Sequence, residues 1–488
     1  MCEDEMKPAL QVIVLGSGGG PLESNTTAFL VRSVAQDWRR GSVVAVDAGV
    51  HLSAIHRIIE ASMPAKIPEL PFTLTSGPFA GLSLPHPSAF DNAIHITNHI
   101  VDTYLITHPH LDHISGFVVN TAGLTGARPK KVAALPSTIQ ALKTHIFNNV
   151  IWPNLSDENN GAGLLTYLRL VEGGSPALGD GEGKGYSEIC DGLLVKICSV
   201  SHGHCIERHS HRGSASSAST RFGSHDAASQ TPRRDAPLRA SSLLSQATFG
   251  PGSPQEQERA CVYDSSAYFI QDQGNHREVL IFGDVEPDSI SLSPRNLQIW
   301  QDAAPKIAAG YLRAIFIECS YDDSQSNDRL FGHLKPVFVI EELRILAAEV
   351  EIARKMRAIE SKKRKRIGSI ADEPPRRVPS NPGLAPDSPV SPRTVKVSDG
   401  GLTSAPDTPH LATPTAELSL GDPDSFGSSF VVKRQLEGLK VVIIHVKDRL
   451  SNGPPVGEKI LQELQDYEKD AQLGCEFIVS KSGQSFYL

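Results

Sequence analysis

The sequence predicts an α/β protein, because short apolar runs of strand length alternate with amphipathic segments of helix length. Many of these runs are rich in β-branched residues and end in glycine or polar residues, and residues 333–366 have the pattern of one long helix. Hydrophobic residues make up 40% of the 488 residues, which is enough for a sizeable core. A chain of this length exceeds one ordinary core, so we expect either two domains or one large domain with insertions.

The N-terminal part has the pattern of a strand, a glycine-rich turn and a second strand. Residues 11–15 are β-branched and apolar, the glycines within 16–20 interrupt them, and residues 27–32 can pair back as a hairpin. Helical patterns follow at 52–61 and at 136–151, the second with a proline at its start. The remaining strands are expected at 42–49, 101–108, 131–135, 193–203, 260–272, 278–285, 312–321, 439–448 and 475–483.

Two stretches lack these patterns. Residues 208–257 are rich in Ser, Ala, Arg and Pro, and residues 363–428 are rich in Pro, Ser, Asp and Thr. Such compositions bury too little apolar surface to offset the entropy of ordering the chain. We therefore interpret both stretches as disordered insertions.

Charge and cysteine content exclude several classes of protein. The net charge of −8 argues against a protein that coats nucleic acid or anionic membranes. The seven cysteines include no CxxC pair, which favours a reduced, intracellular protein, and neither a signal peptide nor a membrane span is visible. We expect a cytoplasmic location without nucleic-acid or membrane partners. The basic run at 362–366 keeps a nuclear location open, although such a run is more often the solvated end of a helix.

The stretch THPHLDHISG concentrates three histidines and one aspartate within six positions. Imidazole nitrogens and carboxylate oxygens are the usual ligands of zinc and similar ions. Residues two apart on a strand face the same way, so His108 and His110 can share one metal at a strand end. Asp112 and His113 lie on the turn that follows and can bind a second metal, while Leu111 points into the core. The alternative is a polar turn with incidental histidines, and the complete pattern after an apolar strand disfavours it.

Four side chains cannot complete two metal sites, so other strand ends should supply further ligands. His202, Asp284 and His445 each lie at the end of an apolar strand. Each alone is more often a structural polar residue, but together they fit the missing half of the site. His204 competes with His202, and Asp448 competes with His445.

Two further features lie near strand ends. Asp47 is a candidate acceptor that orients a ligand histidine through a hydrogen bond. The glycine run at 16–20 lacks the Lys-Ser/Thr of a phosphate-binding loop and the spacing of a dinucleotide-binding turn. We interpret it as a tight hairpin turn beneath the metal site.

The order of HxHxDH, then His, Asp and His, each after an apolar strand, resembles the metallo-β-lactamase superfamily. The resemblance implies an αββα sandwich, in which two mixed sheets lie face to face with helices outside and two divalent metal ions at one edge. Zinc is the expected ion. It also implies two ligand sets that share Asp284: His108, His110 and His202 for one metal, and Asp112, His113 and His445 for the other.

A closer resemblance is to the class II cyclic nucleotide phosphodiesterases of the fungal, low-affinity cAMP type. It rests on THPHLDHISGFVVN, LGSGGGPLESNTTAFLV, IFIECSYDDSQSNDRLFGHLKP and IIHVKD. It implies a single metallo-β-lactamase-like catalytic domain over 1–488 that contains both insertions. The implied reaction is hydrolysis of 3′,5′-cyclic AMP, with cyclic GMP as a second candidate, to the 5′-nucleotide. Lys335 departs from the family pattern, in which we expect a hydroxyl residue after His-Leu.

The implied mechanism uses a hydroxide activated by two metals, which attacks phosphorus in line and expels the 3′ oxygen. Asp284 would hold both metals and help to orient the hydroxide. The resemblance further implies that His333 is the general acid for the leaving oxygen and that Glu318 is its partner carboxylate. The alternative for His333 is a buried histidine that caps the following helix.

Two other functions stay open. One is a different hydrolase on the same scaffold, such as a tRNA 3′-end endonuclease, against which the acidic net charge weighs. The other is a non-catalytic scaffold, which has no use for the complete set of ligand and acid positions. Besides the small-molecule substrate, a homodimer is a candidate assembly. Candidate targets of proline-directed kinases are Ser388, Ser391, Thr408 and Thr413.

Overall fold

The computed structural model describes residues 7–67, 69–124, 128–178, 184–208, 258–370, 434–450 and 452–488. The chain divides into two compact units, residues 1–354 with 434–488 and residues 355–433. Of the second unit, the described residues are the C-terminal part of helix α6 (Pro336–Ile370). The expectation of a single domain over 1–488 stays a prediction.

The two predicted insertions fall largely outside the described residues, as do the four candidate phosphorylation sites. Arg208 is the last residue of strand β10 (Leu193–Arg208), and the rest of the first insertion is not described. Residues 363–370, where the second insertion was expected to begin, belong to α6, and the predicted helix was itself expected to reach residue 366. This segment begins with lysines and arginines, which favour helix, so α6 continues through it.

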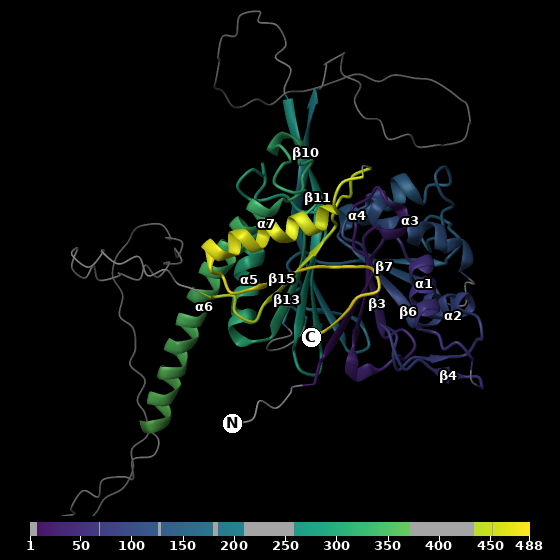
Figure 1. The fold of residues 1–488 in the computed structure, drawn as a ribbon, viewed down its shortest axis with the longest axis horizontal. Coiled ribbons are helices and arrows are strands. Elements are labelled where there is room, and N and C mark those ends of the chain that lie inside the picture. The colour runs from purple at the N-terminus through teal and green to yellow at the C-terminus, as the bar shows by residue number, and fades with distance from the viewer. Residues whose placement is uncertain are drawn as a thin grey trace, which may run out of the picture. The chain divides into compact units, whose positions relative to one another are not determined.

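Two seven-stranded sheets form the first unit (Figure 1). The first sheet has the order β16–β1–β2–β3–β6–β7–β8 and the second the order β15–β14–β13–β12–β11–β10–β9. In the first sheet the strands from β3 to β8 are parallel and the others antiparallel. In the second sheet the strands from β12 to β15 are parallel and the others antiparallel. Both sheets are therefore mixed, as the sequence led us to expect.

The strands of the first sheet are β1 (Leu10–Gly16), β2 (Ala28–Ser33), β3 (Val43–Ala48), β6 (Val101–Leu105), β7 (Lys130–Ala134), β8 (Leu165–Arg169) and β16 (Ser485–Tyr487). Those of the second sheet are β9 (Ser187–Cys190), β10, β11 (Glu258–Asp272), β12 (Glu278–Phe282), β13 (Leu312–Glu318), β14 (Lys440–Ile444) and β15 (Glu476–Val479). A small hairpin pairs β4 (Phe72–Thr73) with β5 (Ser83–Leu84).

The sheets pack through a buried apolar cluster to which both contribute, for example Val46 from β3 and Phe316 from β13. Helices α1 (Leu52–Ser62), α2 (Ala89–His95), α3 (Leu111–Asn120) and α4 (Pro136–Ala141) cover the outer face of the first sheet. Helices α5 (Asn296–Ala309), α6 and α7 (Val456–Ala471) cover that of the second. Figure 1 shows these helices on opposite sides of the paired sheets. The result is an αββα sandwich.

Three details differ from the predicted elements. The strand expected to reach residue 108 ends at Leu105. The helix expected over 136–151 changes to a π-helix at Leu142 and ends at Ile146. The HxHxDH segment was predicted to end in a turn, but α3 begins at Leu111. In the described part of the chain, no helix has an apolar stretch that could cross a membrane.

Candidate metal centre

Five histidines and two aspartates converge where strands of both sheets end. They form two groups that share Asp284, and within each group the candidate ligand atoms lie within 4.8 Å of one another. The carboxyl ends of neighbouring parallel strands meet at one edge of a sheet, which explains how distant segments come together. The contributing residues are His108 and His110 after β6, Asp112 and His113 in the first turn of α3, His202 in β10, Asp284 after β12 and His445 after β14.

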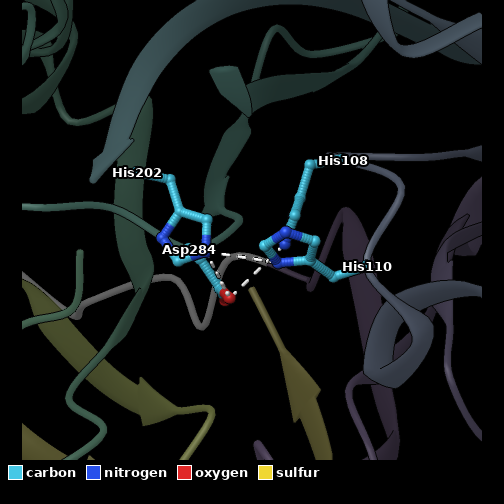
Figure 2. Close-up of side chains that lie close together, drawn as sticks. All are labelled: His108, His110, His202 and Asp284. Atoms are coloured by element: carbon cyan, nitrogen blue, oxygen red, sulfur yellow. Dashed lines mark hydrogen bonds and ion pairs between the residues drawn. The ribbon is translucent and has the colours of Figure 1, made fainter. Parts of the chain in front are cut away.

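The first group surrounds one oxygen of Asp284. Figure 2 shows the rings of His108, His110 and His202 around this carboxylate. The Nε2 atoms of His108 and His202 lie 3.4 Å and 3.5 Å from Asp284 Oδ2. His110 Nδ1 lies 3.3 Å from His202 Nε2. His110 is exposed whereas the other three residues are buried, so the group opens to solvent on the side of His110.

The second group surrounds the other oxygen of the same carboxylate. The Nε2 atoms of His113 and His445 lie 3.1 Å and 3.3 Å from Asp284 Oδ1. His445 Nε2 also lies 3.1 Å from Asp112 Oδ2. Each oxygen of Asp284 therefore faces one group of side chains, which is the arrangement that a bridging carboxylate needs.

Several of the converging atoms are buried without a hydrogen-bond partner among the described residues. They are His108 Nε2, His113 Nε2 and Asp284 Oδ1. Leaving buried polar atoms unsatisfied costs free energy, so such atoms call for a ligand. Imidazole and carboxylate donors at this spacing suit divalent metal ions of the zinc type, and the residues present fit two such ions.

Hydrogen bonds from surrounding residues hold the second group in place. Asp47, which is 1% exposed, accepts a hydrogen bond from His113 Nδ1 at 2.7 Å. It also accepts bonds from the backbone N–H and the hydroxyl of Thr107, both at 2.8 Å. Asp47 thus fixes the ring of His113 and the start of the loop that carries His108, which is the orienting contact that a metal-binding histidine needs.

A buried carboxylate, Glu318, connects the metal centre with His333. Glu318 Oε1 accepts a hydrogen bond from His333 Nδ1 at 2.8 Å, and Oε2 accepts one from the hydroxyl of Ser320 at 2.7 Å. The same hydroxyl lies 3.0 Å from Nδ1 of His445. The His333 ring stacks on that of His445 with centroids 5.2 Å apart. His333 therefore lies directly beside the second group, and its orientation is set by Glu318.

Burial and neighbouring charges shift the pKa values of three candidate ligands toward the protonation states that bind metal ions. Burial lowers the pKa of His202 well below its ordinary value. His110 is exposed at one side, but the partial desolvation of its ring by the surrounding site, and then the charge of His108, lower its pKa to about 4. Both rings are therefore neutral, as metal ligands must be. Burial would raise the pKa of Asp284, but His113 and His445 hold it well below the ordinary value. Asp284 is consequently ionised throughout the neutral range.

The structure brings all nine predicted site residues together, and some predicted details are wrong. Leu111 is 67% exposed and does not anchor the core, because the helical turn that begins there turns its side chain outward. His204 and Asp448, the two competing residues, belong to neither group of candidate ligands. Lys335 donates to the carbonyl of Gln325 at 2.9 Å.

Several contributing residues escaped the sequence analysis. The carbonyl of Gly332 accepts a hydrogen bond from His202 Nδ1 at 2.9 Å. Ser320 contacts both Glu318 and His445. Ser115, in the ISG that follows the ligand motif, donates to the carbonyl of Gly49 at 2.9 Å and so ties α3 to the end of β3. All three residues lie in the motifs that carry the family resemblance, but neither periodicity nor spacing singled them out within those motifs.

The chain also matches the model of a known protein family. The family model of the class-II cAMP phosphodiesterases matches residues 9–360. The chain belongs to this family. The family predicted from the sequence motifs is thereby confirmed.

Individual relatives support the assignment. The chain is 28% identical over 337 residues to a 3′,5′-cyclic-nucleotide phosphodiesterase of Schizosaccharomyces pombe, with 69% of this chain and 75% of the relative covered. It is 26% identical over 382 residues to one of Candida albicans, with 70% and 83% covered. The crystal structure of unliganded yeast PDE1 matches with a TM-score of 0.60 and 19% identity over 99% of this chain and 100% of that one. This match supports the predicted fold of two mixed sheets with helices outside.

Proposed function

We propose that this protein hydrolyses 3′,5′-cyclic AMP, and cyclic GMP as a second substrate, to the 5′-nucleotide at the centre around Asp284. The observation that carries the proposal is the carboxylate of Asp284, which presents one oxygen to each of two histidine-rich groups. The curated relatives named above are 3′,5′-cyclic-nucleotide phosphodiesterases, which supports the same substrate class.

We further propose that the two groups each hold one zinc ion. His108, His110 and His202 would bind the first, Asp112, His113 and His445 the second, and Asp284 both. When bound, two such ions supply positive charge for the phosphate oxygens and lower the pKa of a water molecule beside phosphorus.

His333 is the proposed acid for the leaving group. Its Nδ1–H is donated to Glu318 at 2.8 Å, so a proton on the other nitrogen, Nε2, is free for transfer. The carboxylate stabilises the doubly protonated ring and fixes its orientation. As the water oxygen bonds to phosphorus and the bond from phosphorus to the 3′ oxygen breaks, the Nε2 proton passes to that oxygen, and the proton lost by the water, passed through solvent, restores the one on Nε2. The product is the 5′-phosphate with a free 3′ hydroxyl.

The purified, zinc-loaded protein should be offered cAMP, cGMP, an aryl phosphodiester and pre-tRNA. We expect hydrolysis of the cyclic nucleotides to 5′-nucleotides, and cleavage of pre-tRNA alone would contradict the proposal. Asp284→Ala should abolish turnover and lower the bound zinc, because it removes an oxygen from both groups. Asp466→Ala on the exposed face of α7 is the matched control and should leave both unchanged. Unchanged zinc and activity in Asp284→Ala would show that the bridging role is wrong.

A further inference from the structure

A pocket of 540 Å³ lies beside the proposed metal centre and has no part in binding the metals. Its walls are the glycine turn at 19–21, Tyr321 and the segment 447–450, with Val456 at the start of α7. Its size falls in the range of about 300–1,000 Å³ that is typical of small-ligand pockets.

The pocket shares its walls with both halves of the reaction centre. Gly19 packs against the ring of His445, since a Cβ at this position would lie 2.4 Å from Cε1 of that ring. On the other wall, the ring of Tyr321 lies 6.0 Å from that of His333, measured between centroids. The pocket therefore adjoins the candidate metal ligand His445 through Gly19 and the proposed acid His333 through Tyr321.

Backbone hydrogen bonds hold the walls in place. The N–H of Gly19 donates to the carbonyl of Val446 at 3.0 Å, and the N–H of Asp448 donates to the carbonyl of Gly20 at 3.1 Å. Lys447 donates from its backbone to Ser320 at 3.0 Å and from Nζ to the carbonyl of Gly19 at 3.1 Å. The pocket is thus formed before a ligand binds, which reduces the entropic cost of binding.

The lining suits a flat, uncharged ring system with a few donors. Glycine, Pro21, Val456 and the Tyr321 ring provide apolar surface. The buried carboxylate of Asp322 is neutralised by Arg449 at 2.6 Å and by Lys459 at 2.8 Å. The carboxylate of Asp448, in contrast, is exposed and makes no hydrogen bond or ion pair with other described residues, so it is available as an acceptor.

We propose that this pocket binds the nucleoside part of the cyclic nucleotide, with Tyr321 as the aromatic wall for the base and Asp448 as the acceptor for its N–H groups. This inference rests on the proposed function and assigns residues to substrate recognition that metal chemistry does not involve. The Tyr321 hydroxyl stays protonated at neutral pH, because burial and then Glu318 raise its pKa to about 12. It can therefore donate a hydrogen bond to a ribose or phosphate oxygen.

The acceptor also distinguishes between purines. Guanine presents a ring N–H and an amino group side by side, and a carboxylate can accept both. Adenine presents only its amino group on the corresponding edge, so a carboxylate accepts one bond. Asp448 should therefore contribute more to binding of cGMP than of cAMP.

The test compares Tyr321→Ala and Asp448→Asn with wild type on cAMP, cGMP and methyl p-nitrophenyl phosphate, a diester without a nucleoside. Tyr321→Ala should raise KM for both cyclic nucleotides by about 10-fold, as loss of base stacking on an aromatic ring does, and leave kcat/KM for the small diester within about 2-fold. Asp448→Asn should lower kcat/KM by roughly 10-fold for cGMP and by about 3-fold or less for cAMP. The matched controls, Tyr487→Ala on β16 and Asp466→Asn on α7, should match wild type.

The outcomes separate this inference from the proposed function. Turnover of cyclic nucleotides by the wild-type protein tests the proposed function. If the wild-type protein does not hydrolyse them, both the proposed function and the pocket assignment are wrong. If wild type is active, unchanged KM in Tyr321→Ala, or an equal loss on all three substrates, overturns the pocket assignment alone. Bound zinc and the thermal unfolding midpoint of each variant should equal those of wild type, so that a folding defect is not read as a binding defect.

Discussion

Gly19 and His445 pack so closely that no side chain fits between them. A Cβ at Gly19 would lie 2.4 Å from Cε1 and 2.6 Å from Nδ1 of the imidazole. The hydroxyl of Ser320 lies 3.0 Å from Nδ1 of the same ring, so the ring cannot move away from Gly19 without disturbing this contact. The glycine run after β1 is thus part of the support of a candidate metal ligand.

Gly19→Ala should displace the His445 ring. Because outer contacts of a metal ligand typically contribute about 10–100-fold to metal affinity or activity, we expect a loss of this size in both. Metal content by mass spectrometry and turnover of cAMP measure it. Gly123→Ala is the control, since a Cβ there meets no atom within 4 Å. Full metal content and activity in Gly19→Ala would show that the His445 ring has room to shift.

Asp47→Asn should weaken the second metal group through His113. The amide keeps the size of the side chain but presents at most one oxygen where the carboxylate accepts bonds from His113 Nδ1 and from Thr107. We expect zinc affinity to fall by roughly 10–100-fold in competition with a chelator. Asp91→Asn in the first turn of α2 should bind zinc like wild type. Equal affinities of all three proteins would contradict the orienting role of Asp47.

Most of the candidate ligands could be predicted because they come at the ends of apolar runs, which indicate strands. Asp284 follows β12 and His445 follows β14, whereas His202 ends an apolar run but lies within β10, which continues to Arg208. The start of α3 could not be predicted in the same way. Asp112 and His113 were expected on a turn, but the helix is held there by tertiary contacts, since the N–H of Gly116 donates to the carbonyl of Gly49 at 2.8 Å.

Contacts between distant segments account for most of what the sequence could not show. The glycine run was expected to form a turn beneath the metal site, yet its packing on His445 depends on the pairing of Gly18 and Gly19 with Val446. The pocket that we propose for the nucleoside is likewise built from segments far apart in the sequence, and none of them carries a motif for base recognition. Such features arise from tertiary structure, which local patterns do not encode.

Glu318→Gln should slow reactions that need a proton on the leaving oxygen. The amide cannot stabilise the doubly protonated ring of His333, so general acid catalysis, worth about 100–10,000-fold, is largely lost. We expect kcat for cAMP to fall by roughly 100-fold. A phosphodiester with a p-nitrophenolate leaving group needs no such proton, so kcat for this substrate should fall by less than about 5-fold. An equal loss on both substrates would indicate a structural role for Glu318 instead.

The stability of the fold should depend on pH through His51, away from the proposed reaction. His51 is 1% exposed, and its Nε2 lies 3.1 Å from the hydroxyl of Tyr104. Burial, and then the charge of Lys130, lower its pKa to about 3. In the unfolded chain the pKa is about 6.5, so below that pH the unfolded state binds more protons than the folded state. The contribution of neutral His51 to stability is therefore complete above pH 6.5 and decreases as the pH falls toward 3.

His51→Phe removes this titration while keeping an aromatic ring. The free energy of unfolding of wild type, relative to that of His51→Phe, should fall by about 2 kcal/mol between pH 7.5 and pH 5, because 1.5 pH units below the unfolded pKa correspond to that amount. Urea denaturation of both proteins at several pH values measures the difference between their free energies of unfolding. Groups other than His51 titrate alike in both proteins, so their contributions cancel in this difference. His56→Phe, at a partly exposed position of α1, should show a difference from wild type that does not change with pH. A pH-independent difference for His51→Phe as well would mean that His51 does not titrate on unfolding.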